Sequence, residues 1–161
     1  MPPITALLHT RNDALRLGRT LETLLPCAQL VIVDHHSTDA TSRIARKYGA
    51  HIIPTDTTTA AIPYLGHVRC EWILCLNPSE SLTEGLQATL FEWSLLAGTK
   101  ISATASFSVL VREQMAGNWL EYPSPETRLI HRSWTRWKGH LPAHDSGSIA
   151  LEGEVLRLPF P

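Results

Sequence analysis

The sequence predicts an α/β fold in which a parallel, Rossmann-like first half is followed by antiparallel strands. Residues 30–33, Leu-Val-Ile-Val, form a short apolar run of the kind that is buried on both faces of a parallel sheet. From residue 103 onwards, apolar residues alternate with serine and threonine, which is typical of a half-buried antiparallel strand. A chain of 161 residues is long enough to bury one core. We therefore expect a single domain, with residues 1–98 as the parallel half and residues 99–161 as the antiparallel half.

Strands and helices alternate at the start of the chain. We expect strands at residues 4–8, 30–33 and 50–53, and helices at residues 14–25 and 40–48. Asn12 or Asp13 can cap the first helix, which Pro26 closes. Ser37 or Asp39 can cap the second helix. This β-α-β-α-β order is typical of the first half of a doubly wound sheet.

The later elements are less regular. Residues 55–69 are expected to form a loop with at most a short helix, followed by a strand at residues 72–76 and a turn at residues 77–80. Ser81 or Thr83 can cap a helix that carries Leu82 and that Gly98 stops. Further strands are expected at residues 103–111, 128–131, 136–138 and 149–158.

Composition narrows the range of partners. The formal net charge of −1 argues against a nucleic-acid partner and against an anionic membrane surface. Three cysteines without a CxxC pair fit a reducing, cytoplasmic compartment. No run reaches transmembrane length, and the amino terminus lacks a signal-peptide pattern. We expect such a protein to lie peripheral to the inner membrane only through a lipid-linked substrate.

Polar residues follow the first two predicted strands. Thr10, Arg11 and Asn12 come after the first strand, and Asp34 ends the second. Ligands of open α/β sheets bind at the carboxyl ends of the strands, so we expect these side chains to face one crevice.

With these pieces in place, the chain resembles the family 2 glycosyltransferases, which have the GT-A fold, and in particular their lipopolysaccharide-core glucosyltransferase-like branch. The matching stretches are residues 4–13, residues 31–41 (Val-Ile-Val-Asp-His-His-Ser-Thr-Asp-Ala-Thr), residues 44–50 and residues 71–82, with weaker similarity at residues 128–132 and 144–145. Members of the family are usually longer than this chain. The resemblance implies a nucleotide-sugar donor, most simply a UDP-sugar, and an acceptor that is a glycan or a lipid-linked sugar.

The resemblance also implies roles for individual residues. Thr10 and Asn12 would line the nucleotide pocket, and Asp34 would accept a hydrogen bond from the uracil edge. Asn77 could hydrogen-bond the ribose. Asp39 would shape the turn, although a simple N-cap explains it at least as well.

The family's metal-binding Asp-x-Asp is degraded, because Asn77-Pro78-Ser79 stands in its place. Mn²⁺ or Mg²⁺ would accompany a bound UDP-sugar, and such ions need anionic oxygen ligands. Ser79 and Glu80 are only weak candidates, so we expect a weakened or absent metal site. The branch's Arg-Asn pair is likewise replaced, by Ala61 and Ile62, and Arg69 is the cation that could compensate.

The resemblance places a catalytic base at Asp145, beside His144. An inverting transfer needs a carboxylate to take the proton of the acceptor hydroxyl. A turn residue within Asp-Ser-Gly-Ser is an equally good explanation of Asp145.

The eight histidines give no metal-binding motif. His140 and His144 are four residues apart, but Pro142 between them prevents a helical pair, and His35 and His36 are adjacent. We therefore expect no histidine metal site.

Two functions remain open. One is a glycosyltransferase-like protein that binds a nucleotide-sugar and, if active, performs an inverting transfer. The other is a catalytically inactive relative that keeps the fold as a binding or interaction module.

Overall fold

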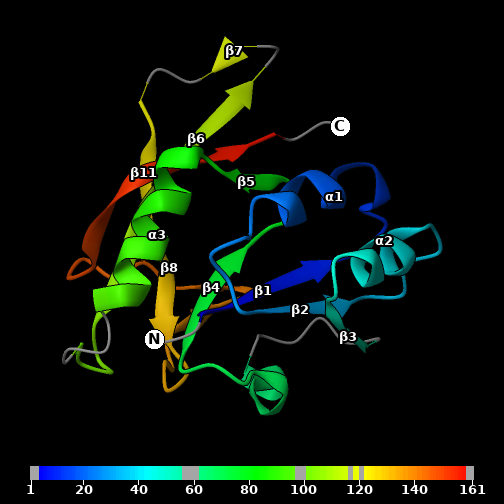
Figure 1. Cartoon of the computed structure of the whole chain (residues 1–161), viewed down its shortest axis with the longest axis horizontal. Coiled ribbons are helices and arrows are strands. Elements are labelled where there is room, and N and C mark those ends of the chain that lie inside the picture. Colours follow the sequence, from blue (N-terminus) through cyan, green and yellow to red (C-terminus); the bar gives the residue numbers. More distant parts are fainter. Residues whose placement is uncertain (1–3, 56–61, 97–100, 116–117, 120–121, 159–161) are drawn as a thin grey trace.

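The structure, a computed structural model, describes residues 4–55, 62–96, 101–115, 118–119 and 122–158. Its centre is a mixed sheet of nine strands, in the order β3-β2-β1-β4-β8-β6-β11-β5, with β7 added beside β6 (Figure 1). A separate two-stranded ribbon consists of β9 and β10.

The first half has the predicted β-α-β-α-β order. Its elements are β1 (Ile4–Thr10), α1 (Ala14–Glu22), β2 (Gln29–Asp34), α2 (Thr41–Lys47), β3 (His51–Pro54), the 3-10 helix η1 (Ile62–His67) and β4 (Trp72–Leu76). Strand β1 pairs in parallel with β2 and with β4, so Thr10 lies beside Asp34 and Leu8 beside Leu76. All seven residues of β1 are buried, as expected for a central strand covered on both faces.

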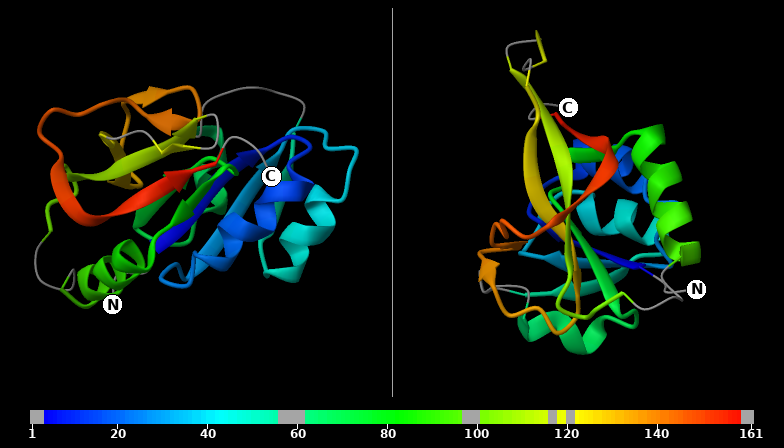
Figure 2. Two further views of the ribbon diagram at one scale, coloured as in Figure 1. Left: turned by 90° about the horizontal axis from the view of Figure 1, so that it is seen from above. Right: turned by 90° about the vertical axis from the view of Figure 1, so that its left-hand side faces the viewer.

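The second half consists of β5 (Glu80–Leu82), α3 (Glu84–Leu96), β6 (Ser106–Met115), β7 (Asn118–Trp119), β8 (Ser124–His131), β9 (Trp137–Lys138), β10 (Leu141–Pro142) and β11 (Ile149–Arg157). The two halves are joined within one sheet, because β8 pairs antiparallel with β4. Strand β6 pairs antiparallel with β8, and in Figure 2 the β6, β8 and β11 strands cross the first half at a steep angle.

Two apolar clusters hold the sheet. On one face, Leu17 of α1 and Leu86 and Leu90 of α3 belong to a cluster that also contains apolar residues of β1, β2, β4, β6 and β11. On the other face, Tyr64 of η1 and Trp134 before β9 pack against Leu7 and Val33. The parallel strands are therefore covered on both sides, as their apolar sequence predicts.

Several expected boundaries were wrong. Helix α1 ends at Glu22, before Pro26. Leu82 lies in β5 rather than in the next helix, because it pairs with Val155 of β11. The helix itself begins after Thr83, whose hydroxyl accepts a hydrogen bond from the Leu86 amide at 3.3 Å. The expected helix stop at Gly98 lies outside the described residues.

The last strand differs most from its expected pairing. Strand β11 is antiparallel to β5 but parallel to β6, so the second half is not purely antiparallel. The register of β11 against β6 shifts between Ala150 and Glu154. Gly153 lies in that shift with a φ of +105°, and a Cβ there would lie 2.5 Å from the Leu86 backbone nitrogen. Only glycine fits this close approach of β11 to α3.

Candidate functional site

A polar crevice lies where the carboxyl ends of β1, β2 and β4 meet. It encloses a cavity of ≈ 390 Å³. Thr10 and Arg11 line it from the end of β1, and Asn77 and Ser79 line it from the turn after β4. This is the edge of an open α/β sheet at which ligands bind.

Two of the four expected nucleotide-binding residues line this cavity, and the other two frame it. Thr10 and Asn77 are lining residues. Asp34 is buried, and its carboxylate accepts hydrogen bonds from the Thr10 hydroxyl at 2.8 Å and from the Ser37 amide at 3.1 Å. Asn12 has a φ of +51°, and its side-chain oxygen accepts a hydrogen bond from the Thr38 amide at 2.7 Å. Asp34 and Asn12 therefore join the loops after β1 and β2.

Asp39 joins the starts of two helices. Its carboxylate accepts hydrogen bonds from the amide of Ala14, at the start of α1, at 3.2 Å and from the amide of Thr41, at the start of α2, at 3.0 Å. The hydrogen bond from the Thr41 hydroxyl is the main reason why the pKa of Asp39 is lowered. These contacts explain Asp39 as a residue that fixes the starts of both helices. The expected N-cap at Asp39 was wrong by one residue, because the N-cap of α2 is Ala40.

The turn after β4 is fixed by a buried carboxylate. Glu80 is fully buried, and its Oε1 accepts a hydrogen bond from the Asn77 amide at 2.8 Å. Its two oxygens also accept hydrogen bonds from the guanidinium of Arg128 at 2.7 and 2.8 Å. Burial acts to raise the pKa of Glu80, but the hydrogen bonds and the charge of Arg128 outweigh it, so the pKa is lowered.

This turn does not fit Mn²⁺ or Mg²⁺. Glu80 is occupied by Arg128 and by Arg157, whose Nη2 lies 3.0 Å from Glu80 Oε2. Ser79 and Asn77 line the cavity but offer no negative charge. The donor set that remains is too weak for a hard divalent cation.

Two arginines lie at the crevice. Arg11 was expected there beside Thr10, whereas Arg16 was not. Both line the cavity, and Arg16 Nη2 lies 2.7 Å from Oδ1 of Asp13, which lines the cavity as well. Helical spacing alone did not distinguish Arg16 from a surface arginine, because the crevice forms only when the loop after β1 meets the turn after β4. Arg11 therefore places positive charge where an anionic ligand would lie, while Asp13 offsets part of the charge of Arg16.

Arg69, in contrast, lies at the opposite edge of the sheet. It precedes β4 and lines a cavity of ≈ 300 Å³ together with Cys27, Gln29 and Tyr48. That cavity lies at the amino ends of the strands, so Arg69 does not replace the missing cation of the crevice. Ala61 lies outside the described residues.

The expected catalytic pair lies apart from the crevice. Asp145 accepts a hydrogen bond from the Ser106 hydroxyl at 2.6 Å and lies 3.3 Å from Arg136 Nη2. The Ser106 hydrogen bond is the main reason why the pKa of Asp145 is lowered. His144 lines a smaller cavity of ≈ 180 Å³ beside Arg128. Neither residue lines the ≈ 390 Å³ cavity.

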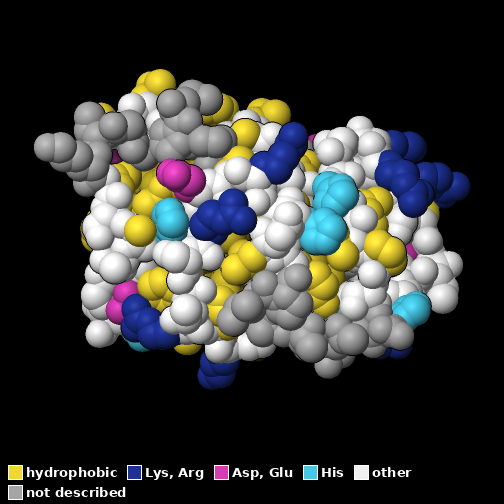
Figure 3. Space-filling model, turned by 90° about the horizontal axis from the view of Figure 1, so that it is seen from below, with side chains coloured by type: hydrophobic (Ala, Val, Ile, Leu, Met, Phe, Trp, Pro, Cys, Tyr) yellow, Lys and Arg dark blue, Asp and Glu magenta, His cyan; other side chains and the backbone are white. Residues whose placement is uncertain are grey.

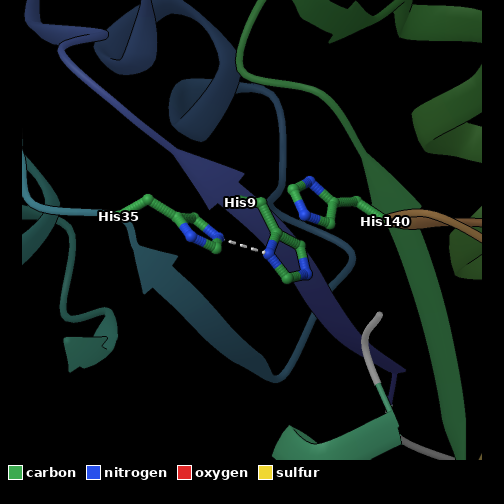
Figure 4. A group of neighbouring side chains, drawn as sticks. All are labelled: His9, His35 and His140. Carbon is green, nitrogen blue, oxygen red and sulfur yellow. Dashed lines mark hydrogen bonds between the residues drawn. The ribbon is translucent and has the colours of Figure 1, made fainter. Parts of the chain in front are cut away.

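Three histidines converge at the floor of the crevice. His9 is on β1, His35 follows β2, and His140 lies in the turn between β9 and β10 (Figure 4). His9 Nδ1 and His35 Nε2 are 2.9 Å apart, and the His9 and His140 rings stack with their centroids 3.7 Å apart. Burial first, and then the neighbouring His140 and His35, lower the pKa of His9 to about 3. The spacing of the histidines in the sequence did not predict this cluster.

The surface gives no sign of an extended basic face on the side seen in Figure 3. Lysine and arginine side chains are scattered there among polar and apolar ones, with histidines between them. None of the described helices is long and apolar enough to cross a membrane.

Comparison with known proteins finds relatives in sequence and in structure. No family model matches the chain. It is 32% identical over 98 residues to an uncharacterized glycosyltransferase of Rickettsia felis, a match covering 54% of this chain and 32% of that relative. A relative of the same description from Rickettsia bellii is 30% identical over 95 residues, covering 52% of this chain and 30% of the relative. The matches thus span about a third of the length of these curated relatives.

Solved structures show the same fold. Mannosyltransferase PcManGT from Pyrobaculum calidifontis, in complex with GDP-Man and Mn²⁺, superimposes with a TM-score of 0.55 at 19% identity, over 69% of this chain and 36% of that one. S. aureus TarS 1–349 in complex with UDP gives a TM-score of 0.53 at 16% identity, over 71% of this chain and 37% of that one. The chain therefore has the mixed-sheet GT-A fold of glycosyltransferases.

Proposed function

We propose that this chain binds a nucleotide-sugar, specifically a UDP-sugar, in the crevice at the ends of β1, β2 and β4. The observation that carries the proposal is the ≈ 390 Å³ cavity lined by Thr10, Asn77, Arg11 and Arg16. Hydrogen-bonding side chains suit a nucleoside, and the two guanidinium groups suit a diphosphate. The sequence similarity to glycosyltransferases and the UDP and GDP-Man complexes of the structural neighbours support the same class of ligand.

Two exposed arginines at opposite edges of the sheet allow a matched test. Arg11 lines the crevice, whereas Arg69 lines the cavity at the amino ends of the strands. One charge-assisted hydrogen bond is worth about 1.5–3 kcal/mol, so Arg11→Ala should weaken UDP binding by about tenfold or more. Arg69→Ala should leave the affinity unchanged. Isothermal titration with UDP and UDP-glucose measures both.

The absence of binding heat for the unaltered chain would overturn the proposal. An equal loss of affinity in the two arginine variants would place the nucleotide elsewhere. Asp34→Asn is a sharper variant, because it replaces one of the two carboxylate oxygens that accept the Thr10 and Ser37 hydrogen bonds with an amide group that can only donate. We expect it to loosen the loops that frame the crevice and to weaken UDP binding.

We further propose that, in an active enzyme, Asp145 acts as the base of an inverting transfer, with His144 beside it. The lowered pKa of Asp145 leaves it ionised at neutral pH, although it also makes the carboxylate a weaker base than an ordinary aspartate. A donor-hydrolysis and transfer assay on Asp145→Asn tests this role. Activity that survives the substitution would remove Asp145 from the chemistry.

The alternative is a catalytically inactive module that retains the fold. The absence of Asp145 and His144 from the lining of the crevice favours it, as does the burial of Glu80 against Arg128. Bound UDP without donor turnover would support the module. Restoring Asp at Asn77 and Ser79 tests the metal question, since Mn²⁺-dependent binding that appears only in the restored protein would exclude Asp-x-Asp-type metal chemistry in the natural sequence.

A further inference from the structure

Three imidazole rings meet at the floor of the crevice from three distant parts of the chain. One ring nitrogen each from His9, His35 and His140 can be chosen so that all lie within 4.8 Å of one another. His9 is carried by β1, His35 by the loop after β2, and His140 by the tight turn between β9 and β10 (Figure 4). His9 is therefore positioned by the central strand of the sheet, and the His35 amide is tied to that strand by a hydrogen bond to the Thr10 carbonyl oxygen at 2.8 Å.

The cluster contains buried nitrogens that the protein does not satisfy. His9 and His35 are each 8% exposed. Among the described residues, His9 Nε2 and His35 Nδ1 are buried without a hydrogen-bond partner. Buried polar atoms are almost always paired, so these two nitrogens show that neither ring is fully satisfied within the protein; they are not the pair that faces across the His9–His35 contact. The cavity beside the rings gives a ligand access to the cluster, because all three histidines line it.

We propose that His9, His35 and His140 bind a divalent transition-metal ion, with Zn²⁺ as the best fit. Imidazole nitrogens prefer Zn²⁺, Co²⁺, Ni²⁺ and Cu²⁺ over Mg²⁺ or Mn²⁺. Three histidines leave one position of a tetrahedral ion open, which is the arrangement of catalytic rather than structural zinc sites. The cavity that the three histidines share with Arg11 and Asn77 would give a fourth ligand access to the ion.

Binding requires the rings to rearrange, above all His140 relative to His9. Two nitrogens on a tetrahedral zinc, each about 2.0–2.1 Å from the ion, lie about 3.3 Å apart. The 2.9 Å contact between His9 Nδ1 and His35 Nε2 must therefore open slightly, and its shared proton must leave. The His9 and His140 planes, now 8° from parallel, must also tilt, because a ligated metal lies in the plane of each ring. His140 can move most easily, since it is half-buried in a turn.

The metal site does not depend on nucleotide binding. If the proposed function holds, however, the position of the ion matters for the bound nucleotide. The ion would then lie next to the donor diphosphate and beside Asn77 and Ser79, where the carboxylates of an Asp-x-Asp are missing. That consequence rests on the proposed function and is tested separately.

The direct test is metal titration of the protein without nucleotide. Protein freed of metal by a chelator, and carrying no polyhistidine tag, is titrated with Co²⁺ while its visible absorption is recorded, and with Zn²⁺ by calorimetry. We expect one equivalent to bind, with the intense absorption bands of four- or five-coordinate Co²⁺. A chain that gives no such bands and no zinc heat would overturn the site.

A second histidine pair supplies the matched control. His51 and His67 stack on the surface, with His51 Nε2 and His67 Nδ1 3.1 Å apart. His140→Ala should weaken Zn²⁺ and Co²⁺ binding by more than about tenfold, because loss of a ligand costs at least as much as loss of an outer-shell partner. His51→Ala should bind both ions normally. Unchanged binding by His140→Ala, or loss in His51→Ala, would refute the assignment, and a thermal melt of each variant checks that it is folded.

A final titration separates the two proposals. UDP binding is measured with and without one equivalent of Zn²⁺. Stronger UDP binding with zinc, lost in His140→Ala, supports the placement of the ion beside the diphosphate. Zinc binding without any UDP binding refutes the proposed function alone and leaves the three-histidine site intact.

Discussion

Glu80→Gln tests the buried ion cluster that fixes the turn after β4. Glu80 and Arg128 are both fully buried, and they form two hydrogen bonds of 2.7 and 2.8 Å. Glutamine keeps the shape of the side chain but leaves the guanidinium without its main counter-charge. Breaking a buried pair in this way costs about 3–5 kcal/mol. We expect about 3 kcal/mol, because Glu126 still lies 2.8 Å from Arg128 Nη2.

The measurement is urea unfolding followed by tryptophan fluorescence. With an m-value of about 2 kcal/mol/M, a loss of 3 kcal/mol lowers the midpoint by about 1.5 M urea. The double variant Glu80→Leu/Arg128→Met should lose less stability than Glu80→Gln, because replacing both charges by apolar groups leaves neither unpaired. A Glu80→Gln midpoint within about 0.3 M of the unaltered protein would refute the reasoning.

The pH dependence of the unfolding free energy provides a second test of the Glu80–Arg128 pair. The pKa of Glu80 is lowered below its ordinary value of 4.5 in the folded protein, so its stabilising contribution is fully present at neutral pH. That contribution is lost as the pH falls below 4.5 towards the folded pKa. The difference in unfolding free energy between the unaltered protein and Glu80→Gln should therefore be constant near neutral pH and shrink in acid. A difference that grows in acid would contradict the assignment.

Two further predictions concern packing and a buried cysteine. Gly153→Ala should destabilise the fold by about 1–3 kcal/mol, because the new Cβ would lie 2.5 Å from the Leu86 nitrogen. Gly85→Ala is the control, because a Cβ there would have nothing within 4 Å. In the same urea assay it should change the unfolding free energy by less than about 1 kcal/mol. Burial raises the pKa of Cys75, which is fully buried, to about 12, so a thiol reagent at mildly alkaline pH should label it far more slowly in the native protein than in urea. Fast native labelling of Cys75 would show that β4 opens readily.

The parallel half of the fold could be predicted from the sequence because its signals are local. Apolar runs such as those in β2 and β4 are buried on both faces, and polar residues follow them at the strand ends. The side-by-side placement of Thr10 and Asp34 followed from the right-handed crossover rule, and the register confirms it.

The rest depended on pairings between distant residues. Strand β5 is three residues long and forms because Leu82 pairs with Val155, which no local pattern reveals. The parallel pairing of β11 with β6 is equally non-local. The histidine cluster was missed for the same reason: His9 and His35 could have been placed together from the register of β1 and β2, but the turn that carries His140 could not.

The antiparallel pairing of β8 with β4 has a practical consequence for anyone who shortens this protein. Trp72 pairs with His131, and Leu74 with Leu129, and the β4 side chains are almost wholly hidden. In a fragment ending after α3, the backbone amides and carbonyls of β4 that pair with β8 would be exposed at an apolar sheet edge. An unpaired sheet edge of this kind can pair with a strand of another molecule, so we expect that fragment to self-associate rather than persist as a monomer.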